Sequence, residues 1–369
     1  MKKINRHVRF LNLSIKNQTN KSALIKSMTK VLDHGIMVMG PEIEKFERKI
    51  ANFCKRKYAI SVGSGTDALV LAIKSLNLNQ NDEVITTSLS WIATANAISL
   101  NGLKPVFADI NDDLNISYKS IKSLISKKTK AVVVVNYTGK IADMDEILKL
   151  CKKNNLHLIE DGSQSFGALY KDRINGSFGI VSAISHNPMK VFSAFGEAGT
   201  ILTNNIKIKK RLEMLRYNGT INKEICIDSS FNARMDTIQA SVLLEKLKSI
   251  RQVINKRKSN ARYYNKYLKN IVEIPFEKNY ENDVYYTYTI KAKNRDKLQK
   301  YLLNNGIETK IQHPLLMPQQ PFYKKAVNGK FENAKKIIKK VLCLPIHENL
   351  NQRDLYHVVN NIKNFYIKK

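Results

Sequence analysis

The sequence has few of the residues that mark fibrous, disulfide-bonded or linker-dominated proteins. Only 8 of its 369 residues are proline and 15 are glycine, which excludes a collagen-like or low-complexity chain. The four cysteines lie far apart without a C-x-x-C pair, so neither a zinc site nor a disulfide framework is expected. No apolar run approaches the roughly 20 residues of a membrane helix, and no apolar signal-peptide core follows the charged N-terminus. We therefore expect a globular, cytoplasmic protein without a metal.

Acidic residues are also scarce, 31 against 62 Lys and Arg, and the net charge is +31. Such a charge attracts polyanions, so nucleic acid has to be considered. However, only 13 of the basic residues are arginine, the residue best suited to contact bases, and the lysines are spread along the chain. We interpret the charge as a compositional bias on solvated faces that also favours a phosphate-bearing small substrate, and we do not expect nucleic-acid binding.

Short apolar segments, most of them non-alternating and rich in Val and Ile, are typical of strands that are covered on both faces. The seven predicted strands lie near Lys57–Val62, Glu83–Thr87, Lys104–Ala108, Ala131–Val135, Leu156–Glu160, Val181–Ser185 and Gly199–Thr203. Helical patterns lie between several of them. This alternation predicts an α/β domain with a mostly parallel sheet.

The pattern changes near residue 235. The elements predicted there are a long helix from Met235 to about Leu268, a strand at Tyr285–Lys291, and helices at Asp296–Asn304 and Glu332–Val341. We therefore predict two domains, a large α/β domain over residues 1–245 and a small α+β domain over residues 246–369.

Two polar groups follow predicted strands directly. Lys190 ends the segment Ser185–Lys190, at a strand exit where α/β sheets bind ligands; alternatively, it is one of many lysines on a loop. Asp161 follows the fifth strand, where a carboxylate can keep a pyridine nitrogen protonated in a pyridoxal-phosphate enzyme. Capping of a following helix is the alternative role for Asp161.

Two further features follow the first and second strands. The glycine-rich turn at Gly63–Asp67 opens a helix, whose free N–H groups and dipole form a phosphate cradle; alternatively, it is a plain turn. Trp91 is suited to stack on a planar cofactor or to fill the core. The four features together, each at the end of a strand, predict a fold type I pyridoxal-phosphate enzyme.

An ordered set of motifs resembles those of the DegT-type sugar-nucleotide aminotransferases, and the similarity covers nearly the whole chain. The matching segments are Gly40–Glu47, Gly65–Leu69, Glu160–Ala168, Ser185–Lys190, Gly196–Gly199, Phe231–Asp236 and Leu344–His347. The resemblance implies that Lys190 is the Schiff-base lysine, that Asp161 pairs with the pyridine nitrogen and that Gln164 binds the phenolic oxygen.

The same resemblance assigns the rest of the cofactor site. The implied phosphate ligands are Gly65, Thr66, Asp67 and Ser185, with Trp91 stacked on the ring. Asn232 is expected to reach the phosphate in a neighbouring subunit, which implies a homodimer. Arg234 is either a substrate contact or a structural ion-pair partner.

The chain departs from the family pattern at several positions. His186 and Asn187 follow the motif serine, and Ala198 replaces a glycine. His313 occupies the place of a family tyrosine and Met317 that of a frequent histidine. A lone histidine is usually a hydrogen-bonded structural residue, and we expect this role for His186 and His347. For His313, both a structural and a substrate-binding role stay open.

The predicted function is that of a homodimeric aminotransferase that converts a nucleotide-linked 3- or 4-keto-sugar, with UDP or dTDP as the nucleotide, to an amino-sugar for surface glycan synthesis. L-Glutamate is the expected donor and Lys190 the expected proton carrier. The alternatives are a pyridoxal-phosphate sugar dehydratase of the same fold, in which a histidine replaces the lysine, and a non-enzymatic regulator that binds the cofactor or nucleic acid.

Overall fold

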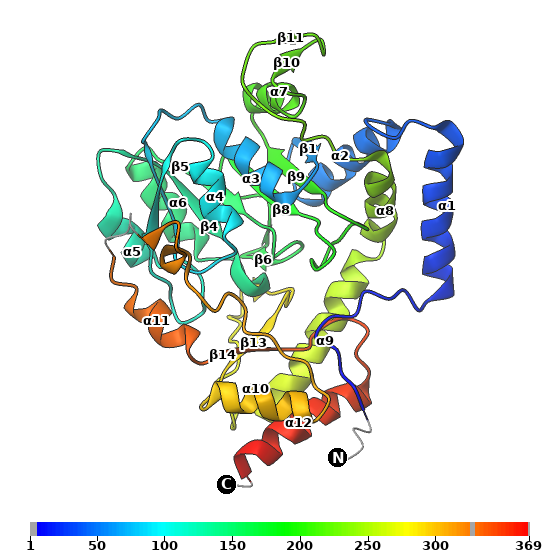
Figure 1. Cartoon of the computed structure of the whole chain (residues 1–369), viewed down its shortest axis with the longest axis vertical. Coiled ribbons are helices and arrows are strands. Elements are labelled where there is room, and N and C mark those ends of the chain that lie inside the picture. Colours follow the sequence, from blue (N-terminus) through cyan, green and yellow to red (C-terminus); the bar gives the residue numbers. More distant parts are fainter. Residues whose placement is uncertain (1–5, 325–328, 368–369) are drawn as a thin grey trace.

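The computed structural model describes residues 6–324 and 329–367. Its body is a sheet covered by helices (Figure 1). The sheet has seven strands in the order β1-β9-β8-β5-β4-β2-β3. Only β9 runs antiparallel to its neighbours, and the other strands are parallel to one another. The strands are β1 (Tyr58–Val62), β2 (Glu83–Thr87), β3 (Lys104–Ala108), β4 (Thr129–Val135), β5 (His157–Asp161), β8 (Val181–Ser185) and β9 (Gly199–Thr203). The predicted α/β fold with a mostly parallel sheet is confirmed.

Both faces of this sheet are apolar, which explains why its strands do not alternate. Along β4, Val132 and Val134 belong to one core cluster, whereas Ala131 and Val133 belong to the other. The helices of the first cluster are α2 (Pro41–Phe53), α5 (Tyr118–Leu124), α6 (Met144–Lys153) and α8 (Thr237–Leu247). Those of the second are α3 (Gly65–Lys74), α4 (Ala93–Ser99) and α7 (Ile206–Leu215).

The N-terminal helix α1 (Gln18–His34) lies at the outer side of the molecule and contacts α8 (Figure 1). It ends at Gly35, whose φ of 70° is left-handed and whose N–H donates to the Val31 carbonyl. Short elements complete the large body. They are η1 (Tyr137–Gly139), β6 (Leu169–Tyr170), β7 (Arg173–Ile174), β10 (Thr220–Ile221), β11 (Ile225–Cys226) and β12 (Glu281–Asn282).

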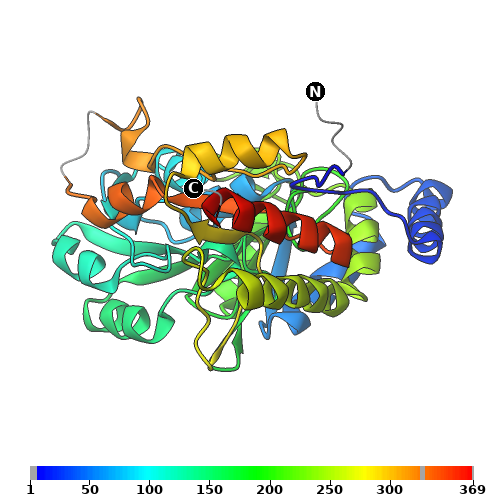
Figure 2. The same ribbon diagram turned by 90° about the horizontal axis from the view of Figure 1, so that it is seen from below.

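The C-terminal elements form a separate apolar cluster at the lower end of the molecule in Figure 1, the end that faces the viewer in Figure 2. A two-stranded antiparallel sheet lies among its helices. The elements are α9 (Ile250–Leu268), β13 (Tyr288–Lys291), α10 (Arg295–Asn304), β14 (Val341–Leu344) and α12 (Gln352–Ile367). In contrast, η2 (Met317–Gln319) and α11 (Glu332–Ile338) pack on the ends of the large sheet through a fourth cluster.

Three predicted boundaries in the C-terminal part are wrong. The long helix is interrupted, because Ser249 leaves the helical region at ψ 3° and separates α8 from α9. The strand begins at Tyr288 rather than Tyr285, whose φ is 50°. The last of these helices stops at Ile338, since Val341 already belongs to β14. In the residues that the structure describes, no helix has the length and apolar character needed to cross a membrane.

Candidate active site

A cavity of about 730 Å³ lies where β1, β2, β5 and β8 reach their carboxyl ends, with the segment Lys310–Leu315 across from them. Parallel α/β sheets bind ligands at this edge. The cavity brings together eight of the residues singled out in the sequence. They are Gly65, Thr66, Trp91, Asp161, Gln164, Ser185, Lys190 and His313.

The phosphate cradle is built from the start of α3 and the end of β8. Ser64 caps α3 by accepting from the Asp67 N–H at 3.0 Å, and the first N–H groups of a helix have no partner within it. A Cβ on Gly65 would lie 2.4 Å from the Ser185 Cβ, so only glycine lets the helix approach the strand this closely. The N–H groups of Gly65 and Thr66 and the Ser185 hydroxyl therefore gather at one anion-binding corner.

Asp161 is fixed at the end of β5 and is buried. One carboxylate oxygen accepts from the Thr94 hydroxyl at 3.0 Å and the other from the Ser163 N–H at 3.1 Å. No helix follows within the next ten described residues, so the helix-cap alternative for Asp161 is wrong. The carboxylate instead faces the cavity in a defined orientation.

Gln164 is held by the loop around Thr138, which also bonds the C-terminal part of the chain. Its side-chain oxygen accepts from the Thr138 N–H at 3.1 Å, which leaves its amide NH₂ for a ligand in the cavity. Thr138 has a left-handed φ of 63°, and its carbonyl accepts from the Thr287 N–H. A Cβ on Gly139 would lie 2.6 Å from the Tyr286 nitrogen, so glycine is required where the two segments meet.

Lys190 lies on the turn after β8, where its N–H donates to the Asn187 carbonyl at 2.8 Å. Its ammonium lies 4.7 Å from the centre of the Tyr286 ring. The face of an aromatic ring attracts a cation. Tyr286 therefore directs the Lys190 amine into the cavity.

Trp91 and His313 form the aromatic side of the cavity. Trp91 is 62% exposed, so the alternative of a core tryptophan is wrong. The His313 ring lies between Trp91 and Tyr137, with ring centres 5.9 and 5.8 Å away. Burial, and then the charges of Lys190 and Lys310, lower the pKa of His313 to about 4, and its buried Nε2 has no hydrogen-bond partner in the described residues. A neutral ring nitrogen is therefore available to a ligand.

Three predicted site residues do not line this cavity. The Asp67 N–H is already used in the cap of α3. Asn232 is exposed, and its side-chain oxygen accepts from the Arg234 Nε at 2.7 Å. Arg234 packs over the Tyr217 ring at 4.4 Å and forms no ion pair with a described residue.

The histidines at 186 and 347 have structural hydrogen bonds. The His186 ring is fully buried between Phe46, Phe166 and Phe192, and its nitrogens bond the Phe192 carbonyl and the Thr200 hydroxyl. His347 bonds the Arg9 carbonyl at 3.2 Å. Among the described residues, no group of three or more His, Cys, Asp or Glu side chains is arranged to hold a metal ion.

Sequence reasoning missed several residues of the cavity. Thr94 lies only three residues after Trp91, so its position after β2, which singled out Trp91, could also have pointed to Thr94. Tyr286 and Lys310 come from the C-terminal part, and no local pattern connects them to the distant strand ends that they meet in the cavity. Glu197 lines the cavity and accepts from the Asn187 amide.

The donor set fits pyridoxal phosphate. The corner at Gly65 and Ser185 suits its phosphate, the oriented Asp161 suits its ring nitrogen, and Gln164 offers an amide to its ring oxygen. Lys190 supplies the amine that the aldehyde requires. The phosphate corner in particular depends on Gly65, because a larger residue would not allow α3 to approach β8 so closely.

Comparisons with known proteins agree with this arrangement. The model of the DegT/DnrJ/EryC1/StrS aminotransferase family matches residues 18–363. The chain is 33% identical over 359 residues to dTDP-3-amino-3,6-dideoxy-alpha-D-galactopyranose transaminase of Aneurinibacillus thermoaerophilus, covering 96% of this chain and 99% of that one. It is 32% identical to UDP-2-acetamido-2-deoxy-3-oxo-D-glucuronate aminotransferase of Pseudomonas aeruginosa, covering 93% and 96%.

The fold is similar to that of the crystal structure of NtdA from Bacillus subtilis with bound cofactor PMP. The TM-score is 0.91 at 28% identity, and the likeness covers 100% of this chain and 87% of that one.

Proposed function

The chain belongs to the DegT/DnrJ/EryC1/StrS aminotransferase family, and from this premise we propose that it transfers the amino group of L-glutamate to the C3 keto group of a UDP- or dTDP-linked sugar. The family depends on pyridoxal phosphate, and the relatives above are aminotransferases of nucleotide sugars. The observation that carries the proposal is the meeting of Lys190, Asp161 and the Gly65 corner in one cavity.

The relatives support the choice of carbon and nucleotide. One relative bears dTDP and a 3-amino group in its name, and the other bears UDP and a 3-oxo group. Lys310 is exposed at the cavity, and we expect its ammonium to bind the substrate diphosphate. His313 offers a neutral Nε2 to a sugar hydroxyl.

The chemistry expected from the cofactor, when bound, is that of an electron sink for the carbon that loses a proton. The Asp161 carboxylate, fixed by Thr94 and Ser163, would hold the proton on the pyridine nitrogen. Lys190 Nζ would take the proton from the α-carbon of the donor and, in the return half-reaction, deliver a proton to the sugar carbon that receives the amine. Trp91 and His313 would shield that carbon from water.

We further propose a homodimer in which Asn232 serves the partner's cofactor phosphate. Asn232 and Arg234 lie outside the cavity of their own chain. Large apolar side chains are exposed on two segments, with Met189 and Phe195 after β8 and Phe231 beside Asn232. Exposed apolar patches of this kind are typical of protein interfaces.

The test is mass spectrometry of products from UDP- and dTDP-linked 3-keto and 4-keto sugars, with glutamate carrying an isotopically labelled amino nitrogen. We expect the label in the 3-amino sugar, and no product with Lys190→Ala. Lys207→Ala, on the exposed face of α7, is the matched control and should keep full activity. Labelled product at wild-type levels from Lys190→Ala would contradict the assignment, and exclusive amination of 4-keto sugars would contradict the choice of carbon.

A further inference from the structure

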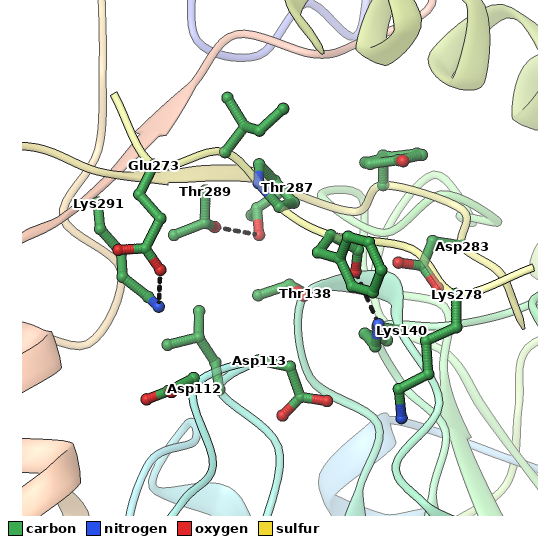
Figure 3. Close-up of a pocket in the computed structure, with 15 residues that line it drawn as sticks. Asp112, Asp113, Thr138, Lys140, Glu273, Lys278, Asp283, Thr287, Thr289 and Lys291 are labelled. Atoms are coloured by element: carbon green, nitrogen blue, oxygen red, sulfur yellow. Dashed lines mark hydrogen bonds and ion pairs between the residues drawn. The ribbon is translucent and has the colours of Figure 1, made fainter. Parts of the chain in front are cut away.

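Figure 3 shows a second cavity, whose volume is about 210 Å³. None of its lining residues lines the candidate active site. One wall is the loop after β3, which carries Asp112 and Asp113. The facing wall is the segment that leads into β13, with Phe276, Asp283 and Tyr285. The cavity therefore lies between segments of the chain that are far apart in sequence.

The charges of this cavity are unbalanced. Each of its three lysines already pairs with another carboxylate, Lys140 with Glu281, Lys278 with Asp143 and Lys291 with Glu273. Asp112, Asp113 and Asp283 form no ion pair with a described residue. The charge of Lys140 acts on Asp113 and Asp283, but Lys140 is already paired with Glu281. In a chain with twice as many basic as acidic residues, it is unexpected that three neighbouring acids form no ion pair with a described residue.

Asp283 is the clearest sign of a ligand-binding site. The residue is only 5% exposed, and its buried Oδ1 has no hydrogen-bond partner among the described residues. An unsatisfied buried carboxylate is costly. Burial raises the pKa of Asp283 well above its usual range, against the opposing charge of Lys140, and burial also raises the pKa of Asp113. Both carboxyl groups would be stabilised by a cation from outside the chain.

We propose that this cavity binds a small organic ammonium ion, with Asp283 and Asp113 as its carboxylate partners. A cavity of about 210 Å³ is larger than a bare metal ion needs and admits a small organic molecule. The rings of Phe276 and Tyr285 add faces that attract an ammonium group. The unpaired acids would repel a phosphate, so the nucleotide sugar does not bind here.

The cavity is connected to the candidate active site through Thr138. Thr138 lines the second cavity, and its N–H donates to the Gln164 oxygen in the first. Thr287 lines the second cavity as well, and its N–H donates to the Thr138 carbonyl. A bound ammonium ion would therefore brace the loop that orients Gln164, whatever sugar the enzyme accepts.

The test is titration calorimetry of the cofactor-loaded protein with N-methylpiperidinium chloride. A tertiary amine cannot condense with the cofactor aldehyde, so binding here is separated from reaction at Lys190. We expect saturable binding of one ion per chain, weakened at least about tenfold in Asp283→Asn, or roughly 1.4 kcal/mol. Asp172→Asn, at an exposed acid outside this cavity, is the matched control and should bind as the wild type does.

Protein stability separates lost binding from misfolding. Without the amine, Asp283→Asn should unfold at the same or a higher temperature than the wild type, because an isosteric amide replaces a desolvated carboxyl group. Displacement of the probe by spermidine or by glucosamine distinguishes a polyamine from an amino-sugar ligand. Unchanged affinity in both Asp283→Asn and Asp113→Asn, or equal displacement by potassium or magnesium chloride, would overturn the proposal.

Discussion

Asp161 allows a single atom's role to be tested. Asp161→Asn keeps the shape and the bond from Thr94 but removes the negative charge. A carboxylate within about 4–6 Å raises the pKa of a neighbouring cationic acid by about 1–3 units, so its loss should lower the ratio of protonated to unprotonated pyridine nitrogen by about 10- to 1,000-fold. We expect the cofactor to stay bound, as measured by absorbance after gel filtration, and turnover to fall by a similar factor. Near-normal turnover would leave Asp161 a purely structural role.

His186 should make stability depend on pH. Burial lowers its pKa to about 4, against 6.5 for an unburied histidine. The unfolded chain therefore binds the proton more strongly, and the free energy of unfolding falls as the pH drops from 6.5 to 4. The loss from this residue is about 3 kcal/mol, since one pKa unit is about 1.4 kcal/mol.

The measurement is urea unfolding at several pH values in this window. His186→Gln should reduce the slope of stability against pH, and a remaining slope is expected because the pKa of His313 is also lowered to about 4. An identical slope in His186→Gln and the wild type would show that this histidine does not titrate on unfolding.

At the residue scale, the sequence predicted those groups that directly follow a strand. Asp161, Ser185 and Lys190 stand at or just after strand ends, so the parallel sheet alone brings them to one edge. Tyr286 and His313 reach the cavity through the folding of the C-terminal part, which no short-range pattern encodes.

At the scale of elements, the contact of α3 with β8 controls the phosphate corner. In Gly65→Ala, the new Cβ would lie 2.4 Å from the Ser185 Cβ, so the helix and the strand must separate. We expect pyridoxal-phosphate affinity to fall at least about tenfold in a fluorescence titration. Gly35→Ala is a control: it strains the end of α1 at φ +70°, at about 1–2 kcal/mol, but meets no atom within 4 Å and should leave the affinity unchanged. Equal affinity in Gly65→Ala and the wild type would contradict the assignment of this corner to the cofactor phosphate.

The strands were predictable because each is apolar on both faces, whereas the C-terminal boundaries were not. Ser249 interrupts a pattern whose hydrophobic period continues from α8 into α9, and a single serine gives no warning of the break. Tyr285 belongs to an apolar run that predicts a strand, but its positive φ serves the contact of this segment with Gly139. In both places, packing against a distant segment overrides the local pattern.

At the scale of the whole molecule, the proposed dimer makes a quantitative prediction. Lys190→Ala and Asn232→Ala should each be nearly inactive alone. If the two residues serve one site from different chains, a mixed dimer has one site with both lesions and one with neither. After random subunit exchange, half of the dimers are mixed, so activity should recover to about a quarter of the wild-type value.

The control is a mixture of Lys190→Ala with Lys207→Ala, on exposed α7, which measures simple dilution. Arg216→Lys is unsuitable for this purpose, because Arg216 supports the fold through Glu47. No recovery in the first mixture, with exchange shown by differential labelling, would mean that Asn232 acts within its own chain, and the site of each subunit would then be complete without its partner.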